Sequence, residues 1–245
     1  MRTILELKDI TLKRGENYIL KGINLRVVYG EKIALMGPSG AGKSSLISIS
    51  NGSTKSTYGS VKWKGTPIEN ISLTNKRLIA TIWQDLRLVE ELNVCQNINT
   101  GVLSRRNILW SLLNLLIELE SEKCLRFLEL VDLPRNLLNM PIRNLSGGER
   151  QRIAIARTFR QEAEILFADE PLSNLDPKLT KKILDLLLGK IQTSYHINPK
   201  SVIISLHRPE LVGDFTRIIG IKKGEIILDK PKVFVNQSDI NSLYF

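Results

Sequence analysis

The first part of the chain alternates between apolar and polar residues. Residues 3–28 follow this pattern on both sides of a turn at residues 15–17, which predicts a pair of antiparallel strands leading into the rest of the fold. The same reasoning predicts further strands at residues 59–64 and 79–83, and a last hairpin formed by residues 217–221 and 225–229.

A long middle segment has a different pattern. From about residue 92 to residue 160 the apolar positions recur with leucine-rich helical periods. The periods are broken at residues 132–134 and 140–141, where prolines end a helix. The chain is therefore expected to carry an all-helical insert within a strand-rich sequence.

Short apolar runs of the kind that form buried strands lie at residues 33–36, 165–168 and 201–206. After the second run, Asp176 and Pro177 form an N-cap and first-turn pair, which predicts a helix that runs to about residue 192. Strands that alternate with helices indicate an α/β fold with a parallel core sheet.

Length and charge limit the possible functions. A chain of 245 residues suits one large domain, or one domain with an inserted subdomain. Lys and Arg number 35 against 25 Asp and Glu, and the net charge of +10 favours polyanions such as ATP, nucleic acid or an anionic membrane face. The basic residues are scattered and have no interleaved aromatics, which favours a solvated surface over a lipid-facing location, and both over nucleic-acid binding.

The sequence contains no segment that is expected to cross a membrane. Its longest strongly apolar run, residues 108–119, is far shorter than the ~20 residues of a spanning helix. The N-terminus has no apolar signal core, so a cytoplasmic location is expected. The only cysteines, Cys95 and Cys124, lack metal-ligand spacing and are expected to be reduced, half-buried residues without a disulfide.

A phosphate-binding loop follows the apolar run at residues 33–36. The motif G-x-x-x-x-G-K-[ST] consists of Gly37, Pro38, Ser39, Gly40, Ala41, Gly42, Lys43 and Ser44, and a helix opens at Ser45. Glycines let successive backbone N–H groups point at the phosphates of a nucleotide. Lys43 would add a full positive charge to the same oxygens, and the hydroxyl of Ser44 would be a ligand of Mg²⁺.

A second motif consists of two carboxylates at the end of a buried strand. Asp169 and Glu170 follow the apolar run at residues 165–168, and the carboxyl end of such a strand is where ligands collect in α/β sheets. Asp169 would hold Mg²⁺ directly or through water, and Glu170 would orient or deprotonate the attacking water. Alone this motif is common, but together with the phosphate loop it predicts nucleotide hydrolysis.

A third motif gives the chain a second anion-binding surface. The run Leu-Ser-Gly-Gly-Glu-Arg-Gln at residues 145–151 stands at the start of a helical segment, with backbone glycines at the helix N-terminus. Here the sequence resembles the ATP-binding cassette (ABC) superfamily, which has Leu-Ser-Gly-Gly-Gln as its signature. The elements that carry the resemblance, in the family's order, are residues 37–44, Gln84, residues 145–151, residues 165–170, residues 173–176 and His207.

The resemblance covers nearly the whole chain and implies its fold. A P-loop NTPase of the ABC type has a parallel core sheet, an N-terminal antiparallel β subdomain and an inserted α-helical subdomain. Residues 1–245 would then form one ABC ATPase domain. Residues 1–90 and 160–245 would form the nucleotide-binding core with its β subdomain, and about 91–159 the helical subdomain with the signature motif.

The resemblance also implies that the working unit is a dimer. In the family, two ATP molecules are held head to tail between two cassettes. A second copy of this chain would therefore bring Ser146, Gly147 and Gly148 to the γ-phosphate that is bound at Lys43 of the first copy. A monomer would contain no complete site.

Three further residues receive roles from the resemblance alone. Gln84 would touch Mg²⁺ and the attacking water, while its loop would sense the membrane subunit. Asp176 would bridge the dimer near the site of the second copy, and His207 would contact the γ-phosphate and hold Glu170 in place. Without the resemblance, Gln84 and His207 would more often be ordinary polar residues.

One position departs from the family pattern. ABC cassettes usually stack adenine on an aromatic residue just before the first turn, but this chain has Arg14 at that position and Tyr18 four residues later. Arg14 could cover the base by cation–π stacking and Tyr18 by ring stacking. It is also possible that neither residue touches the base.

Within the superfamily, the sequence around Gln84 and around His207 resembles that of importers of phosphonate or related phosphorus oxyanions. This resemblance implies a peripheral ATPase on the cytoplasmic face of the cell membrane, which works with a permease and indirectly with an extracytoplasmic solute-binding protein, and not with nucleic acid. The alternatives are a cassette of the lipoprotein-release or cell-division type, and a soluble ABC ATPase that acts on DNA or ribosomes. Substrate specificity is expected to lie in the partner proteins.

Overall fold

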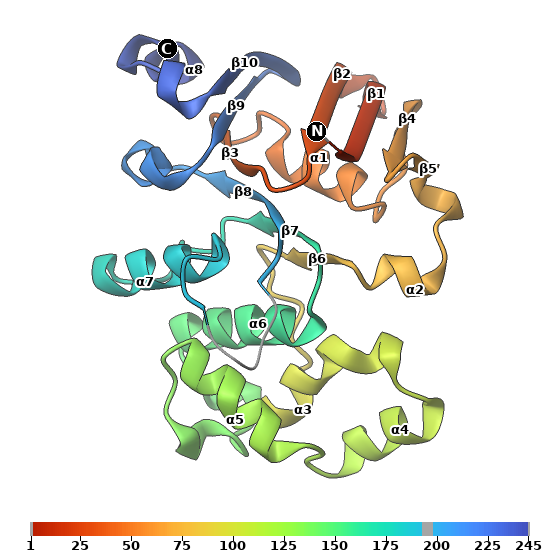
Figure 1. Ribbon diagram of the computed structural model, residues 1–245, viewed down its shortest axis with the longest axis vertical. Coiled ribbons are helices and arrows are strands. Elements are labelled where there is room, and N and C mark those ends of the chain that lie inside the picture. The colour runs from red at the N-terminus through yellow and green to blue at the C-terminus, as the bar shows by residue number, and fades with distance from the viewer. Residues whose placement is uncertain (1, 193–197, 245) are drawn as a thin grey trace. The chain divides into compact units, whose positions relative to one another are not determined.

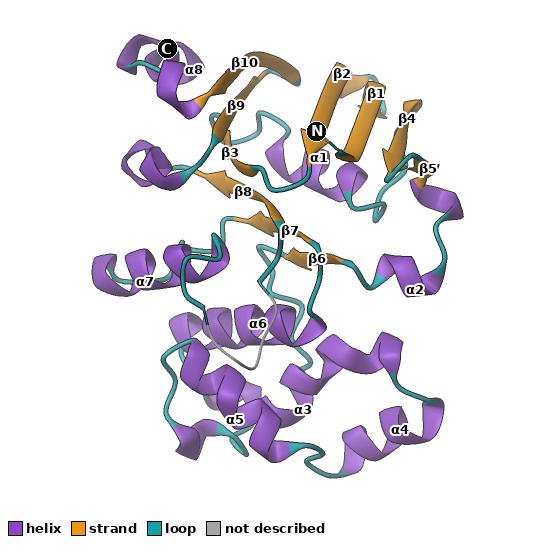
Figure 2. Ribbon diagram, viewed as in Figure 1, coloured by secondary structure: helices purple, strands orange, loops and turns teal. Residues whose placement is uncertain are grey.

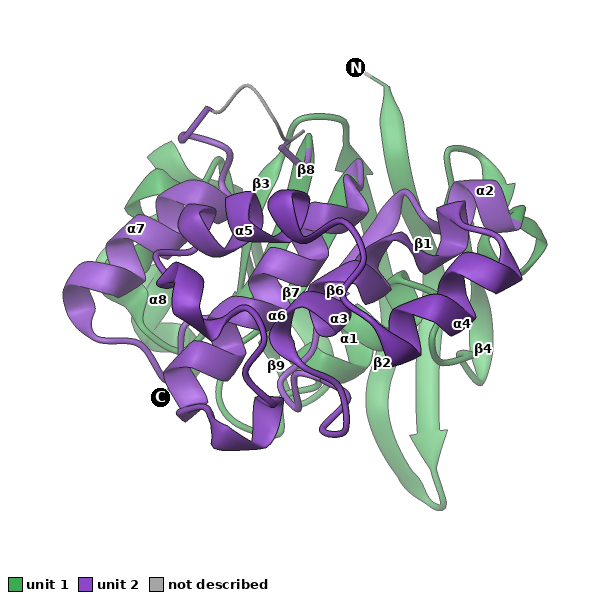
Figure 3. Ribbon diagram, turned by 90° about the horizontal axis from the view of Figure 1, so that it is seen from below, with its two compact units in different colours: residues 1–72, 165–170, 200–245 green, residues 73–164, 171–199 purple. Residues whose placement is uncertain are grey.

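The computed structural model describes residues 2–192 and 198–244. By their internal contacts these residues form two compact units, which Figure 3 distinguishes by colour. Unit 1 consists of residues 1–72, 165–170 and 200–245, and unit 2 consists of residues 73–164 and 171–199. The expected helical subdomain, at about residues 91–159 within one ABC ATPase domain, is a different division of the chain, and its boundaries stay a prediction.

Unit 1 begins with the expected antiparallel sheet. Strands β1 (Thr3–Arg14) and β2 (Asn17–Val28) form the predicted hairpin, and β4 (Tyr58–Trp63) pairs with the other side of β1. The short strand β5 (Thr66–Pro67) completes the order β2-β1-β4-β5, drawn in orange in Figure 2. The sequence prediction for this part of the fold is confirmed.

A second sheet of unit 1 has the strand order β10-β9-β3-β8-β7. Strands β7, β8, β3 and β9 pair in parallel, and β10 returns antiparallel to β9 as the predicted terminal hairpin. Every residue of β7 and β8 is buried, which explains their uninterrupted apolar character. The bounds are β3 Lys32–Met36, β7 Ile165–Asp169, β8 Ser201–Leu206, β9 Arg217–Lys222 and β10 Glu225–Pro231.

Unit 1 also contains two short α-helices among its described residues. Helix α1 (Lys43–Ser50) directly follows the phosphate loop, and α8 (Gln237–Tyr244) packs against β9. The remaining elements are the 3₁₀ turns η1 (Ile68–Asn70), η5 (Pro209–Asp214) and η6 (Lys232–Phe234).

Unit 2 is mainly helical, as Figure 1 shows in its yellow, green and cyan segments. Its longest helix is α6, Gly147–Gln161, and it also contains the short strand β6, Ile79–Ile82. The predicted break at residues 132–134 comes just before the 3₁₀ turn η3 (Arg135–Leu137), and the one at residues 140–141 comes between η3 and the 3₁₀ turn η4 (Ile142–Asn144). Its other elements are α2 (Leu73–Lys76), α3 (Val94–Asn99), η2 (Thr100–Arg105), α4 (Ile108–Leu116), α5 (Ser121–Leu130) and α7 (Pro177–Leu187).

The predicted end of α7 was wrong. The helix ends at Leu187, not near residue 192, because Gly189 adopts the left-handed conformation with φ +73°. The N–H of Gly189 donates to the carbonyl of Leu186, and the N–H of Lys190 donates to that of Asp185, over 3.0 and 2.9 Å. Glycine in this position is a common helix terminator.

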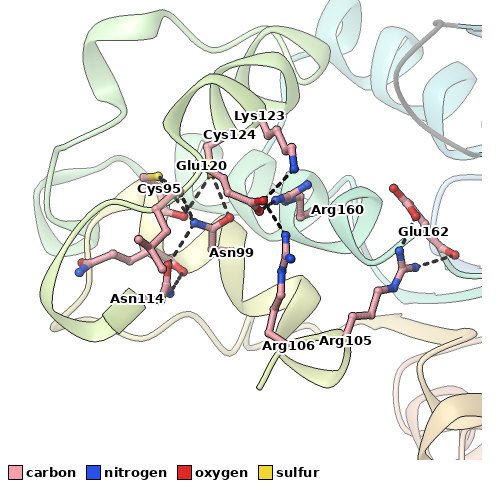
Figure 4. A network of polar contacts seen from close by, with 12 residues as sticks. Cys95, Asn99, Arg105, Arg106, Asn114, Glu120, Lys123, Cys124, Arg160 and Glu162 are labelled. Carbon is pink, nitrogen blue, oxygen red and sulfur yellow. Dashed lines mark hydrogen bonds and ion pairs between the residues drawn. The ribbon is translucent and has the colours of Figure 1, made fainter. Parts of the chain in front are cut away.

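A polar network lies inside unit 2 (Figure 4). Glu120 accepts from Arg106, Lys123 and Arg160, which come from separate elements. The amide of Asn99 meets both cysteines, donating to Cys95 Sγ and accepting from the Cys124 thiol. Both cysteines are free, as expected, but they are fully buried and not half-buried, because they face the packed side of α3 and α5.

Helix α4 buries a polar residue and exposes most of its apolar ones. Its one buried residue is Asn114, which bonds to Asn99 and to the carbonyl of Gln96, while the apolar residues around it are exposed. Ile108 and Leu116 are 76% and 78% exposed. Across the described residues, none of the helices combines the length and the apolar character that spanning a bilayer requires.

Candidate active site

The phosphate loop connects β3 to α1 in unit 1, as the sequence predicted. Gly37, Gly40 and Gly42 all have positive φ, and Gly42 is the N-cap of α1. A Cβ at Gly37 would lie 2.1 Å from the carbonyl oxygen of Ile221, so the loop can only pass β9 with glycine there. Pro38, Ser39 and Ala41 complete the curve, in which Ser39 is exposed.

Lys43 is held within this loop. Its Nζ donates to the carbonyls of Gly37 and Pro38 over 2.8 and 3.0 Å, and the residue is only 5% exposed. Burial lowers the pKa of Lys43, an effect that the nearby carboxylates of Glu170 and Asp169 oppose. The ammonium group is therefore a buried cation that lies among backbone carbonyls and near two acids, and a bound anion would stabilise it.

Ser44 and Ser45 occupy the first turn of α1. Ser44, the predicted Mg²⁺ ligand, is exposed. Their backbone N–H groups belong to the free N-terminal end of the helix, which carries partial positive charge. This end of α1 and the loop before it together form the phosphate-binding surface of unit 1.

The two carboxylates at the end of β7 have different surroundings. Asp169 is buried and accepts a hydrogen bond from the hydroxyl of Ser205, over 2.7 Å. Glu170 has left-handed backbone, with φ +51°, and its N–H donates to the same hydroxyl oxygen over 2.9 Å. Ser205, on the adjacent strand β8, thus fixes both acids.

His207 lies beside Glu170, as the resemblance implied. Its Nε2 is 2.5 Å from Oε1 of Glu170, and it directly follows β8. The described residues bring together Lys43, Asp169, Glu170 and His207 within unit 1. Sequence reasoning missed Ser205, whose one signal was a hydroxyl in an otherwise apolar strand.

These oxygens suit a magnesium ion. Hydroxyl and carboxylate oxygens are the hard ligands that Mg²⁺ prefers, and it needs only one or two carboxylates besides phosphate and water. Ser44 supplies the first kind and Asp169 the second, and the bond from Ser205 holds the Asp169 carboxylate in one orientation. The described residues contain no cluster of three or more His, Cys, Asp or Glu side chains that could hold a metal without a ligand such as phosphate.

The signature residues form the N-terminus of α6 in unit 2. Ser146 is the N-cap, and it exchanges hydrogen bonds with Glu149 in a capping box. The bonds from Ser146 lower the pKa of Glu149, so this carboxylate is fixed in its charged form. A Cβ at Gly147 would meet nothing within 4 Å, whereas one at Gly148 would lie 3.0 Å from the carbonyl of Asn174.

Gln84 and Asp176 are both exposed residues of unit 2. Gln84 lies in the loop that follows β6, and Asp176 caps α7 by accepting from the N–H of Leu179 over 3.0 Å. The cap confirms the helix start that the sequence predicted. The functional roles of the two side chains stay predictions.

Arg14 and Tyr18 lie at the end of the first hairpin of unit 1, and both are exposed. Lys13 stands over the ring of Tyr18, with Nζ 4.3 Å from the ring centre. The next residue along, Ile19, has its carbonyl 3.0 Å from where a Cβ of Gly42 would be, so β2 passes directly by the phosphate loop. Whether Arg14 or Tyr18 stacks on a base stays a prediction.

Comparison with known proteins agrees with this arrangement. The family model for the ABC transporter matches residues 20–173. The phosphonates import ATP-binding protein PhnC of Fusobacterium nucleatum is 34% identical over 249 residues, covering 100% of this chain and 99% of that protein. The protein of the same name from Wolinella succinogenes is 31% identical and covers 98% of this chain and 88% of that protein.

Solved structures show the same likeness. The dimeric ATP-binding cassette MJ0796 bound to ADP and Pi is 28% identical with a TM-score of 0.79, covering 93% of this chain and 98% of that one. CbiO1 from Clostridium perfringens, part of the transporter complex cbiONQ, is 25% identical with a TM-score of 0.74, covering 98% of this chain and 93% of that one.

Proposed function

This chain belongs to the ABC transporter family, whose cassettes bind and hydrolyse ATP, and we propose that it is the ATPase subunit of an importer for phosphonate or a related phosphorus oxyanion. The observation that carries the enzymatic part is the network of Asp169, Ser205, Glu170 and His207 beside the buried Lys43. The names of the relatives support the choice of substrate.

Each residue of this network has a distinct role in the proposed hydrolysis. The phosphate loop and Lys43 bind the β- and γ-phosphates, and Glu170 accepts a proton from the attacking water or orients it. His207 holds the Glu170 carboxylate through Nε2 and contacts the γ-phosphate, where negative charge accumulates. Ser205 keeps Glu170 in its left-handed conformation, so the acid does not have to reorganise during the reaction.

When bound, Mg²⁺ would neutralise charge on the phosphates, with Ser44 and Asp169 as its protein ligands. We also propose that Gln84 contacts this ion and the attacking water. ATP is the proposed nucleotide, with Arg14 or Tyr18 as the candidate contact to its base.

We further propose that the working form is a homodimer in which two ATP molecules are shared. The dimeric cassette of 28% identity supports this arrangement. Ser146, Gly147 and Gly148 of one copy then contact the γ-phosphate held by Lys43 of the other, and Asp176 lies near the shared site. The free N–H groups at the N-terminus of α6, and the partial positive charge of that helix end, would attract the γ-phosphate.

The proposed importer also needs partner proteins. A transmembrane permease would receive the work of ATP-driven closure, and a solute-binding protein would deliver the substrate outside the cell. The cassette would then lie peripherally on the cytoplasmic face of the membrane. No role for nucleic acid follows from the site.

The substrate can be tested by uptake. Cells that lack this chain should lose uptake of radiolabelled alkylphosphonate, and the wild-type gene should restore it while the Lys43→Ala gene should not. Loss of uptake would support the importer assignment. Unchanged alkylphosphonate uptake, together with defects in division or in lipoprotein release, would replace it with the alternative class.

The exposed face of α4 predicts where the permease docks. Leu112 and Leu116 are 52% and 78% exposed, so Asp at either position costs little folding free energy. We expect Leu112→Asp and Leu116→Asp to leave the ATPase activity of the isolated cassette nearly unchanged and to abolish co-purification with the permease, because a buried charge would oppose docking. Leu73→Asp, at another exposed apolar position of unit 2, is the control. Undiminished permease binding by the α4 variants would place the docking surface elsewhere.

A further inference from the structure

The loop that carries Gln84 has an unusual backbone. Leu86 and Arg87 are both left-handed, with φ of 58° and 47°. Neither is glycine, so the conformation is unfavourable for each residue. The loop itself contributes two short-range bonds, from Leu86 N–H to the carbonyl of Trp83 (3.0 Å) and from Arg87 N–H to that of Asp85 (2.7 Å). Consecutive left-handed residues persist where the surrounding structure holds them.

Arg157 of helix α6 holds these two residues in the left-handed conformation. Its guanidinium donates to the carbonyl oxygens of Leu86 and Arg87, over 2.6 Å in each case. These are the same two residues that have left-handed backbone. A guanidinium is a planar fork that can serve two acceptors at once, which the single ammonium of a lysine does less well. Since both acceptors belong to the main chain, the contact fixes the path of the loop.

The surroundings of Arg157 show that this contact carries a cost. Burial, and then the charge of Arg87, lower the pKa of Arg157 to about 10. A cation in such a place needs its hydrogen bonds, because it has lost much of its water. Arg87 meanwhile turns to other partners, stacking on the ring of Trp83 at 3.7 Å and pairing with Asp85 at 3.5 Å.

The helix side of the contact is fixed as well. A Cβ at Gly101 would lie 2.3 Å from the carbonyl oxygen of Arg157, so η2 passes directly against the backbone of α6 at this residue. About two turns earlier on the same helix, Arg150 pairs with Glu90 of the loop. The loop therefore meets α6 at two levels, close to the signature and at Arg157.

We propose that Arg157 is a positioning residue that joins the Gln84 loop to the signature helix, so that a movement of either one is passed to the other. The inference rests on the proposed function, in which the Gln84 loop senses the permease and the N-terminus of α6 binds the ATP of the second copy. Arg157 itself touches neither ATP nor the permease. It acts by keeping the loop and Ser146 in a fixed relation within unit 2.

The test uses the full chain assembled with its permease, and compares wild type with Arg157→Lys and Arg157→Gln. We expect both variants to melt within a few degrees of wild type and to keep the KM for MgATP within about twofold, because the phosphate loop is unchanged. The stimulation of ATPase turnover by the permease should fall by about tenfold or more. Arg126→Lys, an exposed change on α5, should behave as wild type.

Hydrogen exchange on the isolated cassette tests the contact without the permease. Amides of residues 85–92 should exchange faster in Arg157→Lys, while those of β7 and β8 should keep wild-type protection. Adding Leu86→Gly to Arg157→Lys should partly restore the stimulation, because glycine adopts the left-handed conformation without strain. If Arg157 only stabilised the fold, Leu86→Gly would not restore the stimulation by the permease.

The outcomes separate this inference from the proposed function. If the permease stimulates wild type and Arg157→Lys equally, Arg157 is not a positioning residue and the proposed function stands. If the variants lose stability and raise the KM for MgATP together, the role is structural and the inference is wrong. If the permease does not stimulate even wild type, the proposed function fails, and the inference fails with it.

Discussion

Replacing Glu170 with Gln is expected to lower ATP hydrolysis by about a hundredfold to ten-thousandfold while ATP binding persists. Glutamine keeps the size and much of the hydrogen bonding of the side chain but removes the charge that orients and deprotonates water. The contact with His207 and the hydrogen bond from the N–H of residue 170 to the hydroxyl of Ser205 would still hold the residue in place. With closure intact and hydrolysis blocked, an ATP-bound dimer should accumulate. Phosphate release, nucleotide binding and size-exclusion chromatography measure the three effects.

The control for this variant is Glu6→Gln, an exposed change on β1 that also removes one carboxylate. It should leave turnover unchanged, which would show that a loss at Glu170 does not come from net charge. Wild-type turnover in Glu170→Gln would contradict the catalytic role of this residue. Loss of ATP binding in the same variant would show that Glu170 acts on the nucleotide and not on the water.

Lys43→Ala and Ser146→Arg should each reduce the ATPase activity of their own homodimers to background. Lys43 is a buried ammonium whose bonds to Gly37 and Pro38 would be exchanged for stronger, charge-assisted bonds to phosphate. Ser146→Arg places a large side chain on the signature surface and removes the N-cap of α6, at a cost of about 1 kcal/mol of helix stability. Only Lys43→Ala should weaken nucleotide binding by the monomer.

The ATP-binding unit could be predicted well from the sequence because its signals are local. The phosphate loop needs glycines with positive φ, and the acidic pair follows an uninterrupted apolar strand, so both motifs could be placed on their elements. Ser205 was out of reach because a serine inside a buried strand has no distinct pattern. Its two bonds depend on β7 and β8 being neighbours, which is a property of the sheet.

Unit 2 was harder to predict for two physical reasons. The leucine periods indicated a helix at α4 but not which side would be covered, and the buried residue is the polar Asn114, whose amide has partners inside the unit. The left-handed Leu86 and Arg87 carry no glycine signal, because Arg157, seventy residues later in the chain, enforces their conformation. By contrast, the end of α7 at Gly189 followed a known rule and could have been predicted.

The central claim is that two copies of this chain share each ATP, and the amount of ATP retained by mixed dimers tests it most directly. In the Glu170→Gln background, subunits carrying Lys43→Ala are mixed with subunits carrying Ser146→Arg, and labelled ATP per isolated heterodimer is counted. One site of the heterodimer then combines both defects, and the other is intact. After gel filtration, which removes ATP that a single subunit binds without enclosing it, we expect unmodified dimers to retain two ATP molecules, heterodimers one, and each variant by itself none. Heterodimers that form but retain no ATP would contradict the shared site.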